Sequence, residues 1–134
     1  MRETKFRGKR LDNGEWQIGD LITFCDAQGN IHRCFIHLRM SPVGFTEPAL
    51  ASTVCLYEVD PNTVGQFTGL IDKTKTEIYE GDIICYKYLH KNCVGLVSFN
   101  ERLSHFIDYE YSHGKIVGNI YENSKLLEDK NAKR

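Results

Sequence analysis

The sequence lacks several features that usually indicate a function. Its formal net charge is only −1, whereas proteins whose main role is to coat nucleic acid are plainly basic, although a local basic stripe is compatible with this value. It has no apolar run long enough to span a bilayer, and its first residues lack the apolar core of a signal peptide. We therefore expect a cytoplasmic protein with no membrane partner.

The cysteines and the common catalytic motifs point the same way. Five cysteines are an odd number, and none forms a Cys-x-x-Cys pair, so we expect free, mostly buried thiols rather than a disulfide framework. The phosphate-binding loop, the Gly-x-Ser-x-Gly element and the His-Glu-x-x-His element are all missing from the sequence. The sequence thus predicts neither an enzyme nor a cofactor.

What the chain does contain is a succession of short β segments separated by turn residues. Its 134 residues, 41% hydrophobic and 26% charged, suit one ordinary domain or two very small fused units. Turns are expected at 12–14, 26–30 and 72–75, and a connection with a helical turn at 41–52. A short helix is expected at 125–129, capped by Asn123 or Ser124. The predicted strands are 5–11, 15–24, 31–40, 53–59, 64–67, 78–89, 93–99, 104–111 and 115–121.

One sequence pattern occurs twice. A Phe-x-Gly element precedes Gly19-Asp20 in the first half of the chain and Gly81-Asp82 in the second, and hydrophobic residues follow each Gly-Asp. Glycine lets the chain bend into a strand, and aspartate can accept hydrogen bonds from backbone N–H groups at the bend. The repeat predicts a mostly-β fold of small-barrel architecture, two fused SH3-like barrel units at roughly 1–58 and 59–130 within a single domain of residues 1–134, with a short C-terminal helix.

The second copy also carries a family resemblance. Residues 59–86 and 115–127, which include Gly65-Gln66-Phe67-Thr68-Gly69 and Val117-Gly118-Asn119, closely resemble the YopX family of bacteriophage and prophage proteins. The match is weaker in the first half, and residues 25–54 have no matching pattern. The resemblance implies a β-rich domain in a bacterial cytoplasm and no reaction. The motif residues, which we interpret as structural, are Gly65, Gln66, Thr68, Gly69, Asp72, Tyr79, Gly81, Asp82, Gly118 and Asn119.

The candidate for nucleic-acid contact is a basic stripe near the N-terminus. Lys5, Arg7 and Lys9 alternate along one predicted strand, so a row of cations could follow phosphates, with neighbouring aromatic residues stacking on bases. The alternative, which we favour, is a solvated outer strand whose lysines discourage edge-to-edge pairing.

Other constellations have simple structural explanations. His32 with Cys34, and His90 with Cys93, have spacings that a metal site could use, yet no compact ligand pair recurs, so we expect no metal. Asp108 and Glu110 share a strand face and are more simply its solvent side than an acid–base pair.

These patterns favour a non-catalytic protein-interaction or assembly module, whose partner is a second copy, a phage protein or a host protein. The alternative function is a nucleic-acid-binding accessory factor that uses the basic stripe. The sequence identifies no partner.

Overall fold

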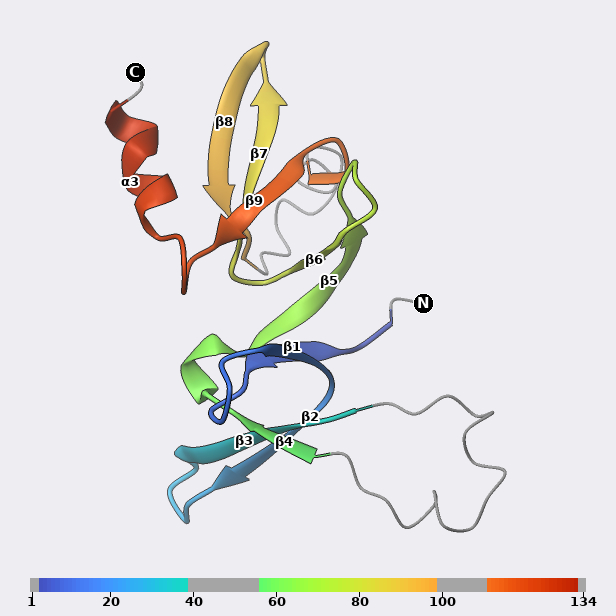
Figure 1. The fold of residues 1–134 in the computed structure, drawn as a ribbon, viewed down its shortest axis with the longest axis vertical. Coiled ribbons are helices and arrows are strands. Elements are labelled where there is room, and N and C mark those ends of the chain that lie inside the picture. The colour runs from blue at the N-terminus through green and yellow to red at the C-terminus, as the bar shows by residue number, and fades with distance from the viewer. Residues whose placement is uncertain (1–2, 39–55, 99–110, 133–134) are drawn as a thin grey trace. The chain divides into compact units, whose positions relative to one another are not determined.

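The computed structural model describes residues 3–38, 56–98 and 111–132 of the chain (Figure 1). The regular elements are β1 (Phe6–Lys9), β2 (Trp16–Cys25), β3 (Ile31–His37), β4 (Leu56–Val59), the 3₁₀ turn η2 (Pro61–Thr63), β5 (Gly65–Ile71), β6 (Glu77–Tyr79), β7 (Asp82–Tyr88), β8 (Lys91–Leu96), β9 (Lys115–Asn119) and α3 (Lys125–Ala132).

The predicted mostly-β architecture is confirmed. Antiparallel pairing links the strands in the orders β4-β3-β2-β1-β5-β6 and β8-β7-β9, and one short helix follows at the C-terminal end. Within the described ranges these strands form two antiparallel sheets and do not close a barrel. Tyr111 belongs to a helical turn, so the predicted strand 104–111 is wrong at that residue; its other residues and the connection 41–52 lie outside the described ranges.

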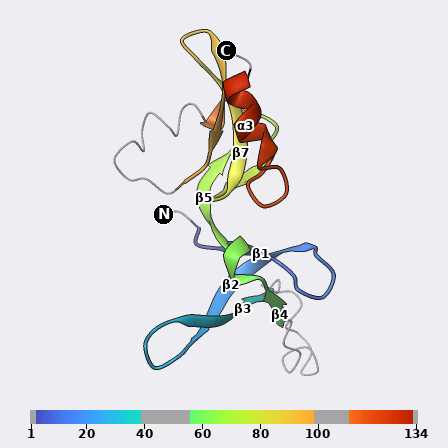
Figure 2. The same ribbon diagram turned by 90° about the vertical axis from the view of Figure 1, so that its left-hand side faces the viewer.

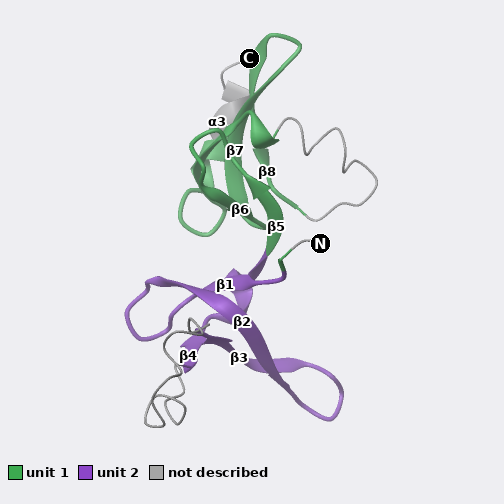
Figure 3. Cartoon of the chain, turned by 90° about the vertical axis from the view of Figure 1, so that its right-hand side faces the viewer, with its two compact units in different colours: residues 1–3, 67–134 green, residues 4–66 purple. Residues whose placement is uncertain are grey.

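The chain divides into two compact units (Figure 3). The N-terminal unit comprises residues 4–66, and the C-terminal unit comprises residues 1–3 and 67–134. Each is described separately below. The repeat units at 1–58 and 59–130 stay a prediction.

In the N-terminal unit, β2 changes partner at Gly19. It pairs with β1 from Trp16 to Gly19 and with β3 from Asp20 onward, and Figure 2 shows β2 and β3 running together to their turn. A Cβ on Gly19 would lie 2.1 Å from the carbonyl oxygen of His37. The ladder shifts register at Phe24/Cys25 and not at Gly19. The glycine permits this close backbone approach at the point where β2 changes partner.

The core of the N-terminal unit lies on one face of this sheet. Cys34, Ile36 and Val59 are at most 3% exposed and pack with Phe6 and Leu21. Strand alternation places Cys34 and Ile36 of β3 on this face.

In the C-terminal unit, the strand predicted at 78–89 is two strands. Gly81 adopts φ +93°, a conformation that L side chains rarely take, and it separates β6 from β7. The Asp82 carboxylate accepts a hydrogen bond of 2.8 Å from the backbone N–H of Tyr79. The predicted glycine bend with a hydrogen-bonded aspartate is thus confirmed at Gly81-Asp82, the second copy of the repeat. Gly19-Asp20, the first copy, lies inside a continuous strand.

The C-terminal unit has its own core and ends in the predicted helix. The buried residues of its core cluster are Ile78, Ile84, Val97 and Tyr111. The helix begins at Lys125 and ends at Ala132. The side-chain oxygen of Asn123 accepts a hydrogen bond from the backbone N–H of Asn119, in the preceding strand, at 3.2 Å.

Candidate functional site

The basic stripe belongs to an inner strand. β1 pairs with β2 along its length and with β5 through Phe6 and Arg7. Beyond Arg7, the backbone N–H of Lys9 donates to the Thr63 hydroxyl at 2.9 Å, and its carbonyl accepts from the Asp60 N–H at 2.8 Å. The interpretation of this segment as an outer, edge-protecting strand is therefore wrong.

The three cations of the stripe are not equally presented to solvent. Lys5 and Lys9 are half-buried. The guanidinium of Arg7 lies over the Trp16 ring, 4.8 Å from its centroid, and its Nε and one Nη nitrogen are buried. Because buried nitrogens are withheld from a phosphate in solvent, the central cation of the stripe contributes little to such a contact.

A different surface of the N-terminal unit stands out. Five large hydrophobic side chains are 38–55% exposed on the β2–β4 strands, namely Ile18, Ile22, Phe24, Ile31 and Leu56. Strand alternation and the ladder register place Ile18, Ile22, Phe24 and Leu56 on the sheet face opposite the core, and we call these four the apolar face. Ile31 lies beyond the register shift at Phe24/Cys25. The outward face of an antiparallel sheet is usually polar, so this composition requires an explanation.

An aromatic contact joins β2 and β3 on the side of the apolar face. Ile22 lies opposite Phe35 in the ladder, and Phe24 lies opposite Arg33. The rings of Phe24 and Phe35 meet edge to face with centroids 5.5 Å apart, a favourable geometry for an aromatic pair.

One ion pair borders these rings. Arg33 donates two hydrogen bonds to the Glu58 carboxylate, at 2.9 and 2.7 Å, and its guanidinium lies 4.9 Å from the centroid of the Phe35 ring. These bonds hold the pKa of Glu58 below its ordinary value and raise that of Arg33. The pair is fixed in a forked geometry and adds no net charge to the face.

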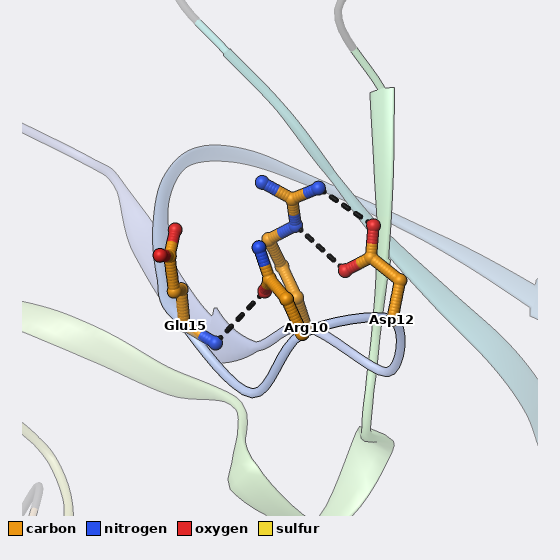
Figure 4. Close-up of polar contacts among 4 residues, drawn as sticks. Arg10, Asp12 and Glu15 are labelled. Carbon is orange, nitrogen blue, oxygen red and sulfur yellow. Dashed lines mark hydrogen bonds and ion pairs between the residues drawn. The ribbon is translucent and has the colours of Figure 1, made fainter.

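A second arginine organises the β1–β2 hairpin (Figure 4). Arg10 donates to both carboxylate oxygens of Asp12, at 2.9 and 2.6 Å, and its guanidinium lies 4.1 Å from the centroid of the Tyr57 ring. The side-chain oxygen of Asn13 accepts from the Glu15 N–H. The tight turn predicted at 12–14 is confirmed by the positive φ of Gly14.

The family-motif residue Asp72 joins distant parts of the C-terminal unit. It is 3% exposed. One carboxylate oxygen accepts hydrogen bonds from the N–H groups of Thr74 and Thr76 and from the Thr74 hydroxyl, while the other accepts from the Ile116 N–H of β9. Burial would raise the pKa of Asp72, but the hydrogen bonds outweigh it and the pKa is lowered.

The other motif residues also bond or pack against backbone. Thr68 donates to the Ile78 carbonyl at 2.8 Å. Gly81 donates its N–H to the Val97 carbonyl, and Asn119 accepts from two N–H groups of the following turn. Gly65 and Gln66 pair with β1, and the Asp82 carboxylate accepts from the Tyr79 N–H. Gly69 has φ +85°, and a Cβ on Gly118 would lie 2.5 Å from the side-chain oxygen of Asn123.

The metal candidates are not brought together into a cluster. His32 lies 3.5 Å from the Asp26 carboxylate in the β2–β3 turn. Across residues 3–38, 56–98 and 111–132, no group of three or more His, Cys, Asp or Glu side chains is placed to hold a metal ion. Asp108 and Glu110 lie outside the described residues.

Sequence reasoning missed the apolar face, although a signal was present. Hydrophobic residues occur on both faces of the predicted strands 15–24 and 31–40, and a sheet with two apolar faces needs a cover on each.

In the part of the chain that the structure describes, no helix has the length and apolarity needed to cross a bilayer.

The fold and its backbone-bonded motif residues define a small, mostly-β protein of two units. The YopX protein family model matches residues 5–128, so the chain belongs to the YopX family and the resemblance is confirmed. No curated protein matches the chain. A crystal structure of protein EF1440 from Enterococcus faecalis is similar, with a TM-score of 0.53 and 24% identity over 95% of this chain and 99% of that chain. This likeness shows the fold alone.

Proposed function

We propose that this chain is a non-catalytic protein-interaction or assembly module, encoded by a phage, prophage or other mobile element and acting in the bacterial cytoplasm. The observation that carries the proposal is the apolar face, whose four side chains are 38–53% exposed. Exposed apolar side chains gathered on one face of a sheet are a typical mark of a docking site. The relation of each unit to an SH3-like barrel is part of the same proposal.

The composition of the surface supports a protein partner. Aromatic residues and arginine are enriched at the centres of protein interfaces, and Phe24, Phe35 and Arg33 lie together on this sheet. Arg33 is neutralised by Glu58, so this arginine offers no free positive charge to a phosphate.

The partner we propose is a second copy of the chain or another phage or host protein. β4 is the last strand of its sheet and contributes Leu56 to the apolar face. The other edge of β4 is bonded to residues 10–11, through the Arg10–Val59 bridge and the hydrogen bond from the Leu11 N–H to the Glu58 carbonyl. We therefore propose that β4 contacts the partner through side chains of the apolar face.

The experiment compares the wild type with a double variant, Ile22→Thr and Phe24→Thr, which keeps β-branched residues in β2. Sedimentation measures self-association, and quantitative affinity purification from producing cells measures other partners. We expect the double variant to lose the partner and Leu11→Ser to retain it, because Leu11 is 59% exposed but outside the face.

Two results would contradict the proposal. One is a monomeric mass for the wild type, together with the same set of co-purified proteins for the wild type, the double variant and Leu11→Ser. The other is recovery of nucleic acid that is released by salt and lost when Lys5, Arg7 and Lys9 are neutralised together, which would support the alternative function.

A further inference from the structure

The β7–β8 hairpin of the C-terminal unit extends beyond the third strand of its sheet. β9 pairs with β7 only from Asp82 to Cys85, whereas β7 and β8 stay paired as far as Tyr88 and Lys91. Figure 1 shows the two strands continuing past β9 to a tight turn. The end of the hairpin is therefore a two-stranded ribbon.

The turn at the tip uses residues that are poorly suited to it. Leu89 and His90 adopt φ +51° and +66°, the left-handed conformation that two-residue hairpin turns require and that Asn-Gly normally supplies. A bulky leucine is strained there. Leu89 is also 74% exposed, the largest exposed fraction among the exposed large hydrophobic residues of the described chain. Folding gains nothing from this side chain, so a role in binding is the simpler explanation.

Positive charge lies on both faces of the ribbon. Lys87 is opposite Asn92, and Lys91 is opposite Tyr88, so alternation puts the two lysines on different faces. No aspartate or glutamate occurs from residue 83 to residue 98. The tip thus combines an apolar end, an exposed tyrosine and a cation on either side.

We propose that this ribbon end is a binding site for the groove of duplex DNA. A DNA groove has a row of phosphates on each side, and the ribbon has one lysine on each face to contact them. A flat anionic surface would meet the tip from one direction only and does not match this arrangement. Proteins that bind the minor groove of DNA frequently insert an apolar side chain between base steps, and Leu89 would be that wedge. This site is separate from the apolar face, and neither proposal depends on the other.

Fluorescence anisotropy of a labelled, mixed-sequence DNA duplex tests the proposal with the full chain. The wild type should bind at about 50 mM salt and weaken steeply toward about 200 mM. Lys87→Gln with Lys91→Gln should reduce the slope of log affinity against log salt by about 1.8, since each phosphate contact contributes about 0.9. The matched control, Lys73→Gln with Lys125→Gln, removes the same charge elsewhere in the unit and should keep the wild-type slope.

The Leu89→Gly variant distinguishes an effect on DNA binding from an effect on folding. Glycine accepts the positive φ, so the variant should melt at or above the wild-type temperature. It should nevertheless bind the duplex about tenfold more weakly, because the wedge is lost. Leu89→Asn, which also suits the turn, should behave in the same way.

Any of four results would overturn the proposal. The wild type could fail to bind the duplex at about 50 mM salt. The Leu89 and lysine variants could retain wild-type binding. A single-stranded oligonucleotide could bind the chain as tightly as the duplex does. Finally, the hairpin could bind phosphatidylserine vesicles and not DNA, which would assign the tip to a membrane surface.

Discussion

Asp72 is the residue whose removal should most damage the C-terminal unit. Asp72→Asn keeps one oxygen for the turn at Thr74 and Thr76, but its amide NH₂ then faces the Ile116 N–H, and two donors confront each other in a site that is 3% exposed. A hydrogen bond to a charged group contributes about 1.5–3 kcal/mol. We expect the free energy of unfolding to fall by about that amount.

Equilibrium urea denaturation followed by circular dichroism measures this loss. The control is Asp26→Asn. Asp26 also accepts backbone N–H bonds, from Gln28 and Asn30, within a local and more exposed turn, so its replacement should cost about 1 kcal/mol or less. Equal losses for Asp72→Asn and Asp26→Asn would refute the role of Asp72 as a link between β9 and the turn.

The pH dependence provides a second check on Asp72. Its pKa is lowered in the folded state, so its contribution is present above the unfolded pKa of about 3.9 and is lost as the pH falls through the lower folded pKa. The stability difference between wild type and Asp72→Asn should be constant above about pH 5 and should shrink below about pH 4. A difference that grows in acid would contradict the assignment.

Two glycine substitutions test the backbone geometry of the two repeat copies. Gly19→Ala should lower the free energy of unfolding by about 3 kcal/mol or more, because its Cβ would overlap the His37 carbonyl; a near-neutral result in urea denaturation would refute the close approach. Gly81→Ala should lower the melting temperature more than Gly29→Ala. Both glycines have positive φ, but a Cβ on Gly81 would lie 2.9 Å from the Tyr121 ring, whereas a Cβ on Gly29 would have no neighbour within 4 Å. Equal shifts of the two melting temperatures would contradict this.

Local chemistry explains which parts of the fold were predictable. The turns at 12–14 and 26–30 were predicted because Asn13 and Asp26 bond to backbone groups within a few residues. The sequence predicted a bend at Gly81, but not the division of residues 78–89 into two strands, because hydrophobic residues continue on both sides of the glycine and such a run is typical of one strand. The φ of +93° at Gly81 becomes evident only when β6 and β7 are seen to belong to different sheets.

The candidate sites depended on sheet order, which the sequence does not reveal. β1 is an inner strand because β5 pairs with it from a distant part of the chain, so the exposure of Arg7 could not be judged from its alternation with Lys5 and Lys9. The apolar face of β2 likewise becomes recognisable only when Ile36 and Val59 are seen to fill the opposite face.

Site-specific photocrosslinking tests the docking surface most directly. A photoreactive phenylalanine analogue at Phe24 would lie on the apolar face, whereas the same analogue at the neighbouring Thr23 would lie on the opposite face, and both positions are exposed. We predict a discrete protein adduct, with a second copy or another protein, from position 24 and not from position 23. Equal crosslinking from the two positions, or none from position 24 in producing cells, would contradict the account.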